Sequence, residues 1–261
     1  MDDGSDCEIA SVIQQMGDSR IHYLRLSRHQ NANIARNAGI LQAKGQYIAM
    51  LDSDDEWLPE HLEKSYQCLK KHQADGIYGS LIIDHIACQQ TITVHPIGKE
   101  ETTIDYLLRN GYRAQTSTLF MTTPSARTIL WDPSLNRHQD YDFIVRYTQK
   151  YRLQALTEAT VIYHLTPKNY TIDYSSCMRV IQANKKDISP QLYNSYHQRI
   201  YKSIRHSTTQ APEVVHYYRQ ESGRYKRYIS YSQYLEFQRP QSVIGKFRCF
   251  IHYLLGFLTN R

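Results

Sequence analysis

Several features are missing from this sequence of 261 residues, and each absence excludes a class of protein. No uninterrupted apolar run reaches the roughly 18 residues that a membrane-spanning helix needs. The best candidate, residues 247–258, is interrupted by Arg248, His252 and Gly256. The first four residues (MDDG) have neither the basic nor the apolar region of a secretion signal. We therefore expect a cytoplasmic protein that does not cross the bilayer.

Cysteine pairs and several catalytic motifs are also absent. The five cysteines are odd in number and include no CxxC pair, so neither a disulfide framework nor a zinc knuckle is expected. The chain has no GxSxG elbow, no Walker loop and no HExxH motif. These absences remove support for a serine hydrolase, a P-loop enzyme and a zinc protease.

Acidic residues are scarce at the C-terminal end. Residues 175–261 carry 14 Lys and Arg against 4 Asp and Glu, a net charge of +10, whereas residues 1–174 carry −4. Ten of the 22 tyrosines also lie in this tail. Basic residues interleaved with tyrosine suit an anionic surface such as lipid headgroups; RNA binding and a helical appendage that packs on the body are the alternatives. We divide the chain into a body, 1–174, and a helical tail, 175–261.

The body alternates strand-like and helix-like segments, which is typical of a layered α/β domain. Strands are predicted over residues 21–26, 46–51, 79–86, 91–96, 114–121 and 155–163. Helices are predicted over residues 33–43, 59–73, 102–108 and 139–151. Beyond residue 174 the pattern indicates helices and connectors.

The most informative motif is an acidic turn that follows an apolar strand. Residues 47–51 (YIAML) lead directly into Asp52, Asp54 and Asp55. Ligands of open α/β sheets bind at the C-terminal ends of strands, and carboxylates this close repel one another unless a cation lies between them. Mg²⁺ or Mn²⁺ prefers such oxygen ligands and keeps positions open for phosphate oxygens. The alternative is an Asx turn that caps the following helix.

Other polar residues fit the same diphosphate site. Asp2 and Asp3, in the turn DDGS, can accept hydrogen bonds from a base or a ribose hydroxyl. Arg36 can bring positive charge to the phosphates, and its alternative role is that of a solvated helix arginine. His164 is a further candidate metal ligand late in the chain.

Asp140 is the candidate general base. It opens the helix predicted at 139–151, where the positive end of the helix dipole stabilises a carboxylate. A positioned base contributes roughly 10²–10⁴-fold to a rate, which is enough to activate an acceptor hydroxyl. The alternative is that Asp140 serves only as a favourable charge at the helix start.

In this order, the motifs resemble those of the inverting family 2 glycosyltransferases of the GT-A fold. The matching stretches are residues 2–5 (DDGS), 31–39 with Ala-Arg-Asn-x-Gly at the end, 45–59 around YIAMLDSDD, and 139–143 (QDYDF) with Arg146. The resemblance implies an α/β domain with a GT-A-type (Rossmann-like) mixed sheet flanked by helices and a C-terminal helical extension. Residues 1–174 would form the nucleotide-sugar-binding and catalytic domain.

The resemblance also implies a role for individual residues. Asp3 would touch the nucleoside, Asp52 and Asp54 would form the DxD pair with Asp54 nearest the Mn²⁺ or Mg²⁺ ion, and Asp140 would be the catalytic base. A sugar would move, with inversion, from a nucleotide diphosphate donor, with UDP as the expected nucleotide. Family members carry a strand, a helix and a second strand ahead of the turn at Asp3, so we expect this domain to be N-terminally incomplete.

The expected process is the synthesis of a bacterial surface polysaccharide, with a glycan or a lipid-linked glycan as acceptor. The basic tail would contact the inner face of the membrane. The alternative is a catalytically inactive protein of degenerate GT-A fold that binds a nucleotide sugar or docks on a membrane or partner. Nucleic-acid binding through the tail is the least favoured function.

Overall fold

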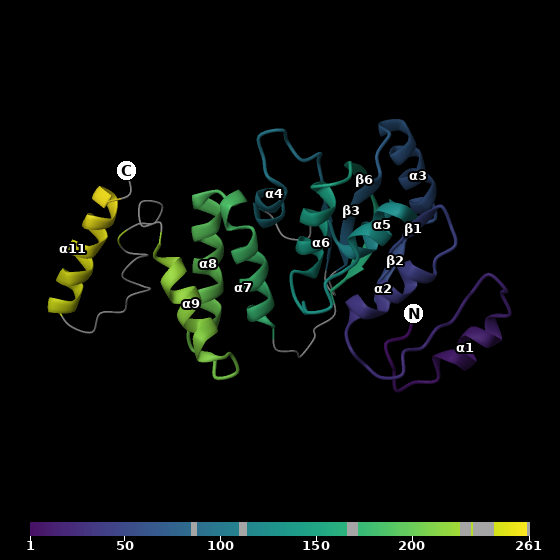
Figure 1. The fold of residues 1–261 in the computed structure, drawn as a ribbon, viewed down its shortest axis with the longest axis horizontal. Coiled ribbons are helices and arrows are strands. Elements are labelled where there is room, and N and C mark those ends of the chain that lie inside the picture. Colours follow the sequence, from purple (N-terminus) through teal and green to yellow (C-terminus); the bar gives the residue numbers. More distant parts are fainter. Residues whose placement is uncertain (85–87, 110–113, 166–171, 225–230, 232–242, 260–261) are drawn as a thin grey trace. The chain divides into compact units, whose positions relative to one another are not determined.

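A computed structural model describes residues 1–84, 88–109, 114–165, 172–224, 231 and 243–259 (Figure 1). The chain forms two compact units. The first comprises Met1–Thr103 and Asn110–Ser176, and the second comprises Ile104–Arg109 and Cys177–Arg261. Among the described residues, no helix has both the length and the apolar character that a membrane span requires.

The first unit is built on a mixed sheet, which has six strands in the described part of the chain. Five strands lie in the order β1 (Tyr47–Ala49), β5 (Phe120–Thr122), β3 (Gly76–Asp84), β6 (Leu153–His164) and β2 (Asp55–Trp57). β4 (Gln89–Ile92) pairs with β3 off this path. β3 and β6 run parallel, and the other pairs are antiparallel.

Helices flank this sheet in the first unit. They are α2 (Ala32–Gln42), α3 (His61–His72), α5 (Thr123–Ile129) and α6 (Gln139–Thr148), with a short 3₁₀ turn, η1 (Thr116–Thr118), ahead of β5. A further helix, α1 (Ile9–Met16), has no buried residue. Leu69 of α3 packs against a buried cluster of Ile77, Phe120 and Leu156 from three strands. The apolar sequence of β3 therefore forms the centre of the core, as expected for a strand that is covered on both faces.

Three of the predicted strands differ from the structure, and residues 85 and 86 of the strand predicted over 79–86 lie outside the described residues. Of the strand predicted over 91–96, only Thr91 and Ile92 lie in β4. Residues 21–26 form no ladder; Arg25 makes a single parallel bridge to Asp2, because Asp2 is followed at once by the turn at Gly4. The strand predicted over 114–121 is mainly the turn η1, and only Phe120–Thr122 forms β5. The sequence patterns also gave no indication of α1, α5 or β2.

The second unit is helical. It contains most of α4 (Thr103–Arg109) and most of α7 (Tyr174–Ala183), followed by the 3₁₀ turn η2 (Lys185–Asp187), α8 (Pro190–Ile204), α9 (Pro212–Ser222) and α11 (Val243–Thr259). We expected the tyrosines of this tail to contact an anionic surface such as lipid headgroups, but some of them are core residues. Tyr193, Tyr196 and Tyr218 are at most 3% exposed, because they pack with His197 between α8 and α9.

We expect Gly76→Ala to destabilise the first unit. A Cβ atom at this position would lie 2.6 Å from the Tyr147 hydroxyl oxygen and 2.9 Å from its Cζ. Tyr147 is fully buried and hydrogen-bonded to Ser125, so its ring cannot move aside without losing these contacts. Overpacking of this kind lowers the free energy of unfolding by about 1–3 kcal/mol. Chemical denaturation measures the difference in the free energy of unfolding.

Gly98→Ala is the matched control for this substitution. Its new Cβ would meet only Glu101 Cβ, at the ordinary contact distance of 3.7 Å. The free energy of unfolding should therefore stay close to that of the wild type. Equal stabilities of the two variants would contradict the tight packing of β3 against Tyr147.

Candidate functional site

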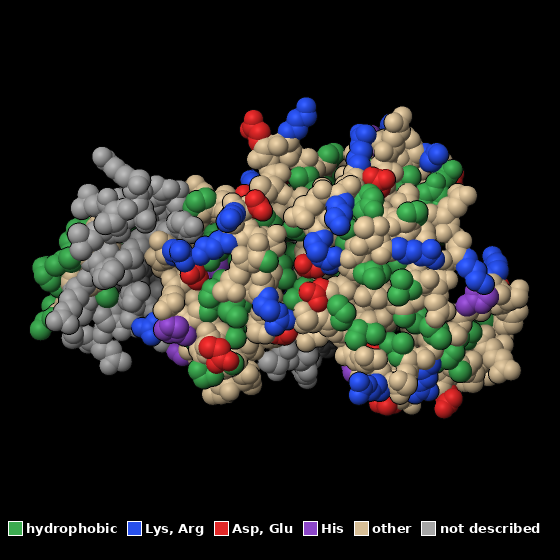
Figure 2. All heavy atoms as spheres, viewed as in Figure 1, with side chains coloured by type: hydrophobic (Ala, Val, Ile, Leu, Met, Phe, Trp, Pro, Cys, Tyr) green, Lys and Arg blue, Asp and Glu red, His purple; other side chains and the backbone are tan. Residues whose placement is uncertain are grey.

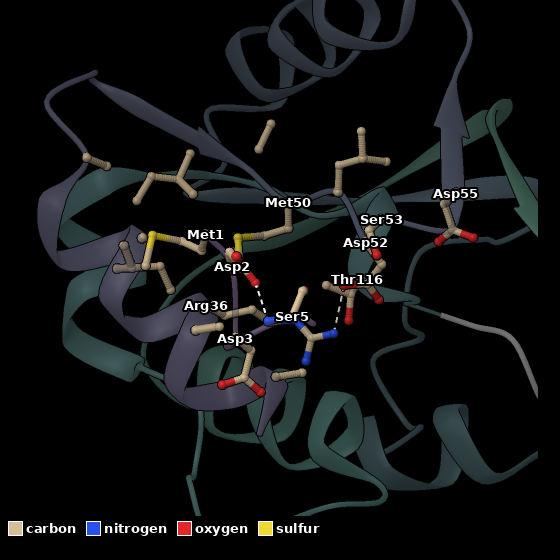
Figure 3. A pocket seen from close by; sticks show the side chains of 18 of the residues that line it. Met1, Asp2, Asp3, Ser5, Arg36, Met50, Asp52, Ser53, Asp55 and Thr116 are labelled. Carbon is tan, nitrogen blue, oxygen red and sulfur yellow. Dashed lines mark hydrogen bonds and ion pairs between the residues drawn. The ribbon is translucent and has the colours of Figure 1, made fainter. Parts of the chain in front are cut away.

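A pocket of about 890 Å³ lies beside β1 in the first unit (Figure 3). Its polar lining includes Asp2, Asp3, Arg36, Asp52 and Asp55, and its apolar lining includes Ala35, Ile40, Ile48 and Met50. Three separated stretches of the chain thus meet at one cavity. Of the described residues predicted for the site, Asp54, Asp140 and His164 lie outside this lining.

The turn after β1 is held in place by Ser117. The Asp52 backbone N–H donates to Ser117 Oγ over 3.0 Å, and the Asp55 backbone N–H donates to the Asp52 carbonyl over 3.1 Å. Ser117 Oγ in turn donates to the Asp55 carboxylate. The end of β1 is therefore fixed by a residue more than sixty positions away in the sequence.

Arg36 joins α2 to this turn. Its Nη2 donates to Asp52 Oδ1 over 2.7 Å, and its Nη1 donates to Asn33 Oδ1 over 3.2 Å. The guanidinium carbon lies 4.8 Å from the centre of the Trp131 ring, which is a cation–π distance. With only 12% of its side chain exposed, Arg36 is not a solvated helix arginine. Figure 3 shows the guanidinium between the N-terminal acidic turn and Asp52.

The carboxylate of Asp55 is buried and makes hydrogen bonds within the fold. Asp55 is the first residue of β2, it is 9% exposed, and it accepts from Ser117 Oγ and from the His164 backbone N–H. Burial raises the pKa of this carboxyl, the nearby charges of Asp54 and Asp52 raise it further, and the hydrogen bond from Ser117 lowers it. The raised pKa shows that burial and the neighbouring carboxylates disfavour the charged form of Asp55, and that the hydrogen bonds from Ser117 and His164 offset this only in part.

His164 does not join the acidic turn as a ligand through its ring. Its Nδ1 lies 3.2 Å from Asp84 Oδ2 and its Nε2 lies 3.1 Å from Glu56 Oε1. The hydrogen bond with Glu56 is the main cause that raises the pKa of this imidazole. Within the described ranges, no group of three or more His, Cys, Asp or Glu side chains is arranged to hold a metal ion. The four predicted ligands are therefore not assembled into one closed site.

Asp2 stabilises the N-terminal turn. Its Oδ1 accepts from the Ser5 backbone N–H over 2.8 Å, and its Oδ2 accepts from the Tyr23 hydroxyl. These hydrogen bonds, with that from Tyr23 first, lower its pKa to about 2. Gly4 permits the turn because its φ is +77°, and a Cβ there would lie 2.7 Å from the His29 backbone nitrogen.

Asp3 lines the pocket with a different set of contacts. Its Oδ1 accepts from the Gln30 backbone N–H over 3.0 Å, and its Oδ2 lies 3.1 Å from His29 Nδ1. The side chain is 18% exposed. Asp3 thus presents a partly accessible carboxylate to the cavity, whereas the carboxylate of Asp2 is buried.

Asp140 lies in the first turn of α6, as predicted. Its Oδ1 accepts from the Tyr141 backbone N–H over 3.0 Å. Burial raises the pKa of this carboxyl, whereas the hydrogen bond from Tyr141 and the charges of Arg137 and Arg36 lower it. The charge of Arg36 therefore acts on Asp140 as well as on the pocket.

Its neighbour Asp142 is engaged differently. It accepts from Arg146 Nε over 2.9 Å, and Arg146 also donates to the carbonyls of Ile129 and Leu130. Asp142 therefore orients Arg146, which joins α6 to the end of α5. Of the two carboxylates in this turn, Asp140 is the better candidate for proton transfer.

Several residues that build the site were not predicted from the motifs. Ser117 organises the acidic turn, and Trp131 lies against the Arg36 guanidinium. Asn37 accepts from the Trp131 backbone N–H and donates to its carbonyl, both over 2.8 Å. Asn37 lies in the matched Ala-Arg-Asn-x-Gly stretch, so that motif could have indicated a structural asparagine beside Arg36.

Comparisons of the sequence with known proteins agree with these motifs. A family model described as glycosyl transferase family 2 matches residues 1–128. Amylovoran biosynthesis glycosyltransferase AmsB from Erwinia amylovora is 29% identical over 141 residues, which cover 51% of this chain and 47% of AmsB. UDP-Glc:alpha-D-GlcNAc-diphosphoundecaprenol beta-1,3-glucosyltransferase WfgD from Escherichia coli is 32% identical over 109 residues, which cover 42% of each chain. The chain thus spans less than half the length of these two relatives.

Solved structures resemble the whole fold at low sequence identity. S. aureus TarS 1–349 in complex with UDP matches with a TM-score of 0.62 and 16% identity, covering 98% of this chain and 81% of that one. GalNAc-T7 with UDP, GalNAc and Mn²⁺ matches with a TM-score of 0.52 and 14% identity, covering 85% and 47%. These likenesses confirm the α/β fold of GT-A type.

We expect Tyr23→Phe to remove a pH-dependent part of the stability. The pKa of Asp2 in the folded protein is lowered from 3.8 to about 2, chiefly by the Tyr23 hydroxyl. The stabilisation is therefore fully present above about pH 4 and is lost as the pH falls towards 2. The variant should unfold more easily than the wild type at neutral pH, and the difference should vanish near pH 2. Urea denaturation at several pH values measures this.

Tyr66→Phe is the control, because Tyr66 is 44% exposed and makes an edge contact with the Tyr47 ring. Its small effect on unfolding should not vary over the same acidic range. A difference between Tyr23→Phe and the wild type that persists unchanged at pH 2 would contradict the assigned role of Asp2.

Proposed function

We propose that this protein, whose residues 1–128 match the family model of glycosyl transferase family 2, transfers a sugar from a nucleotide diphosphate donor to a hydroxyl group during polysaccharide synthesis. The observation that carries this function is the pocket in which Asp3, Arg36 and Asp52 meet. AmsB is named for amylovoran biosynthesis and WfgD for transfer from UDP-Glc to a lipid diphosphate-linked sugar. These names support a glycan or lipid-linked glycan as acceptor.

The pocket suits a nucleotide diphosphate in size and charge. Its volume of about 890 Å³ lies within the usual range of roughly 300–1,000 Å³ for small-molecule sites. Arg36 is held by α2 and can donate two parallel hydrogen bonds to phosphate oxygens. The carboxylate of Asp3 can accept from a base or ribose. The UDP in the TarS structure supports UDP as the nucleotide.

The acidic turn fits a divalent cation that also binds the donor. Mg²⁺ is commonly held by one or two carboxylates together with substrate phosphates, so a closed protein site of three ligands is not required. Asp52 and Asp54 supply oxygen donors of this kind, and the GalNAc-T7 structure contains Mn²⁺. When bound, Mn²⁺ or Mg²⁺ would offset the negative charge on the diphosphate.

Asp140, which lies in the first unit, is the proposed base. The acceptor hydroxyl gives its proton to the Asp140 carboxylate while its oxygen bonds to the anomeric carbon. The bond from that carbon to the diphosphate oxygen breaks in the same step, so the configuration inverts. Burial raises the pKa of Asp140, which makes it a stronger proton acceptor than an exposed aspartate.

We expect UDP together with Mn²⁺ to raise the melting temperature. A ligand at about 100 times its Kd adds about 2.7 kcal/mol to the free energy of unfolding, which corresponds to a shift of several degrees. Asp54→Asn should remove the part of the shift that depends on Mn²⁺, and Glu63→Gln, an exposed carboxylate on α3, should not. No shift with any nucleotide diphosphate and any divalent ion would contradict the proposal.

We expect Asp140→Asn to separate binding from catalysis. UDP binding, measured by calorimetry, should be retained, because Asp140 lies outside the lining of the pocket. The release of UDP from UDP-glucose or UDP-N-acetylglucosamine, with water or a glycan as acceptor, should slow by roughly 10²–10⁴-fold.

Asp142→Asn tests the same helical turn without the proposed base. It should lower stability through its lost contact with Arg146 and should retain more of the turnover than Asp140→Asn. Binding of UDP without turnover in the wild type, unchanged in Asp140→Asn, would instead indicate a non-catalytic nucleotide-sugar-binding protein.

A further inference from the structure

Helix α11 carries a stripe of large apolar side chains that the rest of its unit leaves exposed. The exposed fractions are 83% for Val243, 70% for Ile244, 62% for Phe247, 41% for Phe250, 43% for Ile251 and 45% for Leu254. With 3.6 residues per turn, these six positions fall within one arc of about 120° around the helix. We call them the α11 stripe. Single exposed apolar residues are ordinary, but a contiguous stripe marks an interaction surface.

The other side of α11 is already occupied. Tyr253 is 9% exposed and packs with Cys249 against Tyr231. The Tyr231 hydroxyl also donates to the Lys246 carbonyl over 2.9 Å. These contacts leave the α11 stripe exposed on the other side of the helix. Figure 2 shows hydrophobic side chains exposed in the segment that Figure 1 labels α11.

The charge around the α11 stripe is almost all of one sign. Residues 224–261 contain seven Lys and Arg and one acidic residue, Glu236. The helix itself contains Lys246 and Arg248 and no acidic residue. A helix with an apolar face, a basic surplus and no spanning length is typical of one that lies in the plane of a membrane interface.

We propose that α11 lies on an anionic membrane, with the α11 stripe inserted among the lipids and the basic residues near the headgroups. The cytoplasmic leaflet carries a negative surface potential that attracts Lys and Arg. A second copy of the chain is a poorer partner, because each tail carries +10 and two like-charged tails repel each other.

Co-sedimentation of the full chain with lipid vesicles tests this proposal. The protein should sediment with vesicles that contain phosphatidylglycerol and should bind pure phosphatidylcholine vesicles much more weakly. High salt should weaken the binding, because at 1 M ionic strength the Debye length falls to about 3 Å. The double substitution Phe247→Ser with Ile251→Ser should lower the ratio of bound to free protein at least about tenfold. The reason is that each apolar side chain buried among the lipids contributes to the free energy of membrane binding.

A second double variant provides the matched control. Val12→Ser with Met16→Ser removes two exposed apolar side chains from α1, which are 52% and 60% exposed, and should leave vesicle binding unchanged. Circular dichroism should show the same helical content in both double variants, since all four residues are exposed. The readout requires no enzymatic activity, so it is independent of the proposed reaction.

Several outcomes would overturn the proposal. These are equal binding to neutral and anionic vesicles, no vesicle binding at all, and binding that survives the α11 substitutions. An oligomer that dissociates in the α11 double variant, seen by size-exclusion chromatography with light scattering, would assign the α11 stripe to a second copy instead.

Discussion

The ion pair between Arg36 and Asp52 is the interaction on which the candidate site depends. It connects α2 to the turn that ends β1 across 2.7 Å, and it places a positive charge between carboxylates that would otherwise repel one another. Trp131 and Asn33 hold the guanidinium from other directions. A diphosphate offers a guanidinium two acceptor oxygens in the geometry that Arg36 can match, so the proposed donor would compete with Asp52 for Arg36.

The acidic residues of the site divide into those that maintain the fold and those that remain for chemistry. Asp2 and Asp55 are buried and have hydrogen-bond donors on their carboxylates. Asp3 and Asp52 are more accessible and border the cavity. The acidity of the turn is therefore partly structural, and fewer carboxylates are left for a cation than the motif alone implies.

The sequence was sufficient to predict the family and the fold type. It also predicted that four residues share one site, and the structure has all four in the lining of one pocket: Asp2, Asp3, Arg36 and Asp52. Those predictions relied on local patterns, namely a strand followed by a polar turn and a helix that opens with a carboxylate. The contacts of Ser117 and His164 could not be predicted in this way. They depend on the register of β2 against β6 and on the position of η1, which are set by packing between distant segments.

The tail illustrates the same limit. Its charge follows from composition alone, but some of the tyrosines that we expected on the surface belong to the core between α8 and α9.

The role of the pocket as a nucleotide diphosphate site is tested most directly by a crystal structure of the protein with UDP and Mn²⁺. We expect the diphosphate to take the Arg36 guanidinium from Asp52, with Mn²⁺ between the phosphates and the Asp52–Asp54 turn. UDP bound elsewhere, with the pair between Arg36 and Asp52 intact, would contradict it.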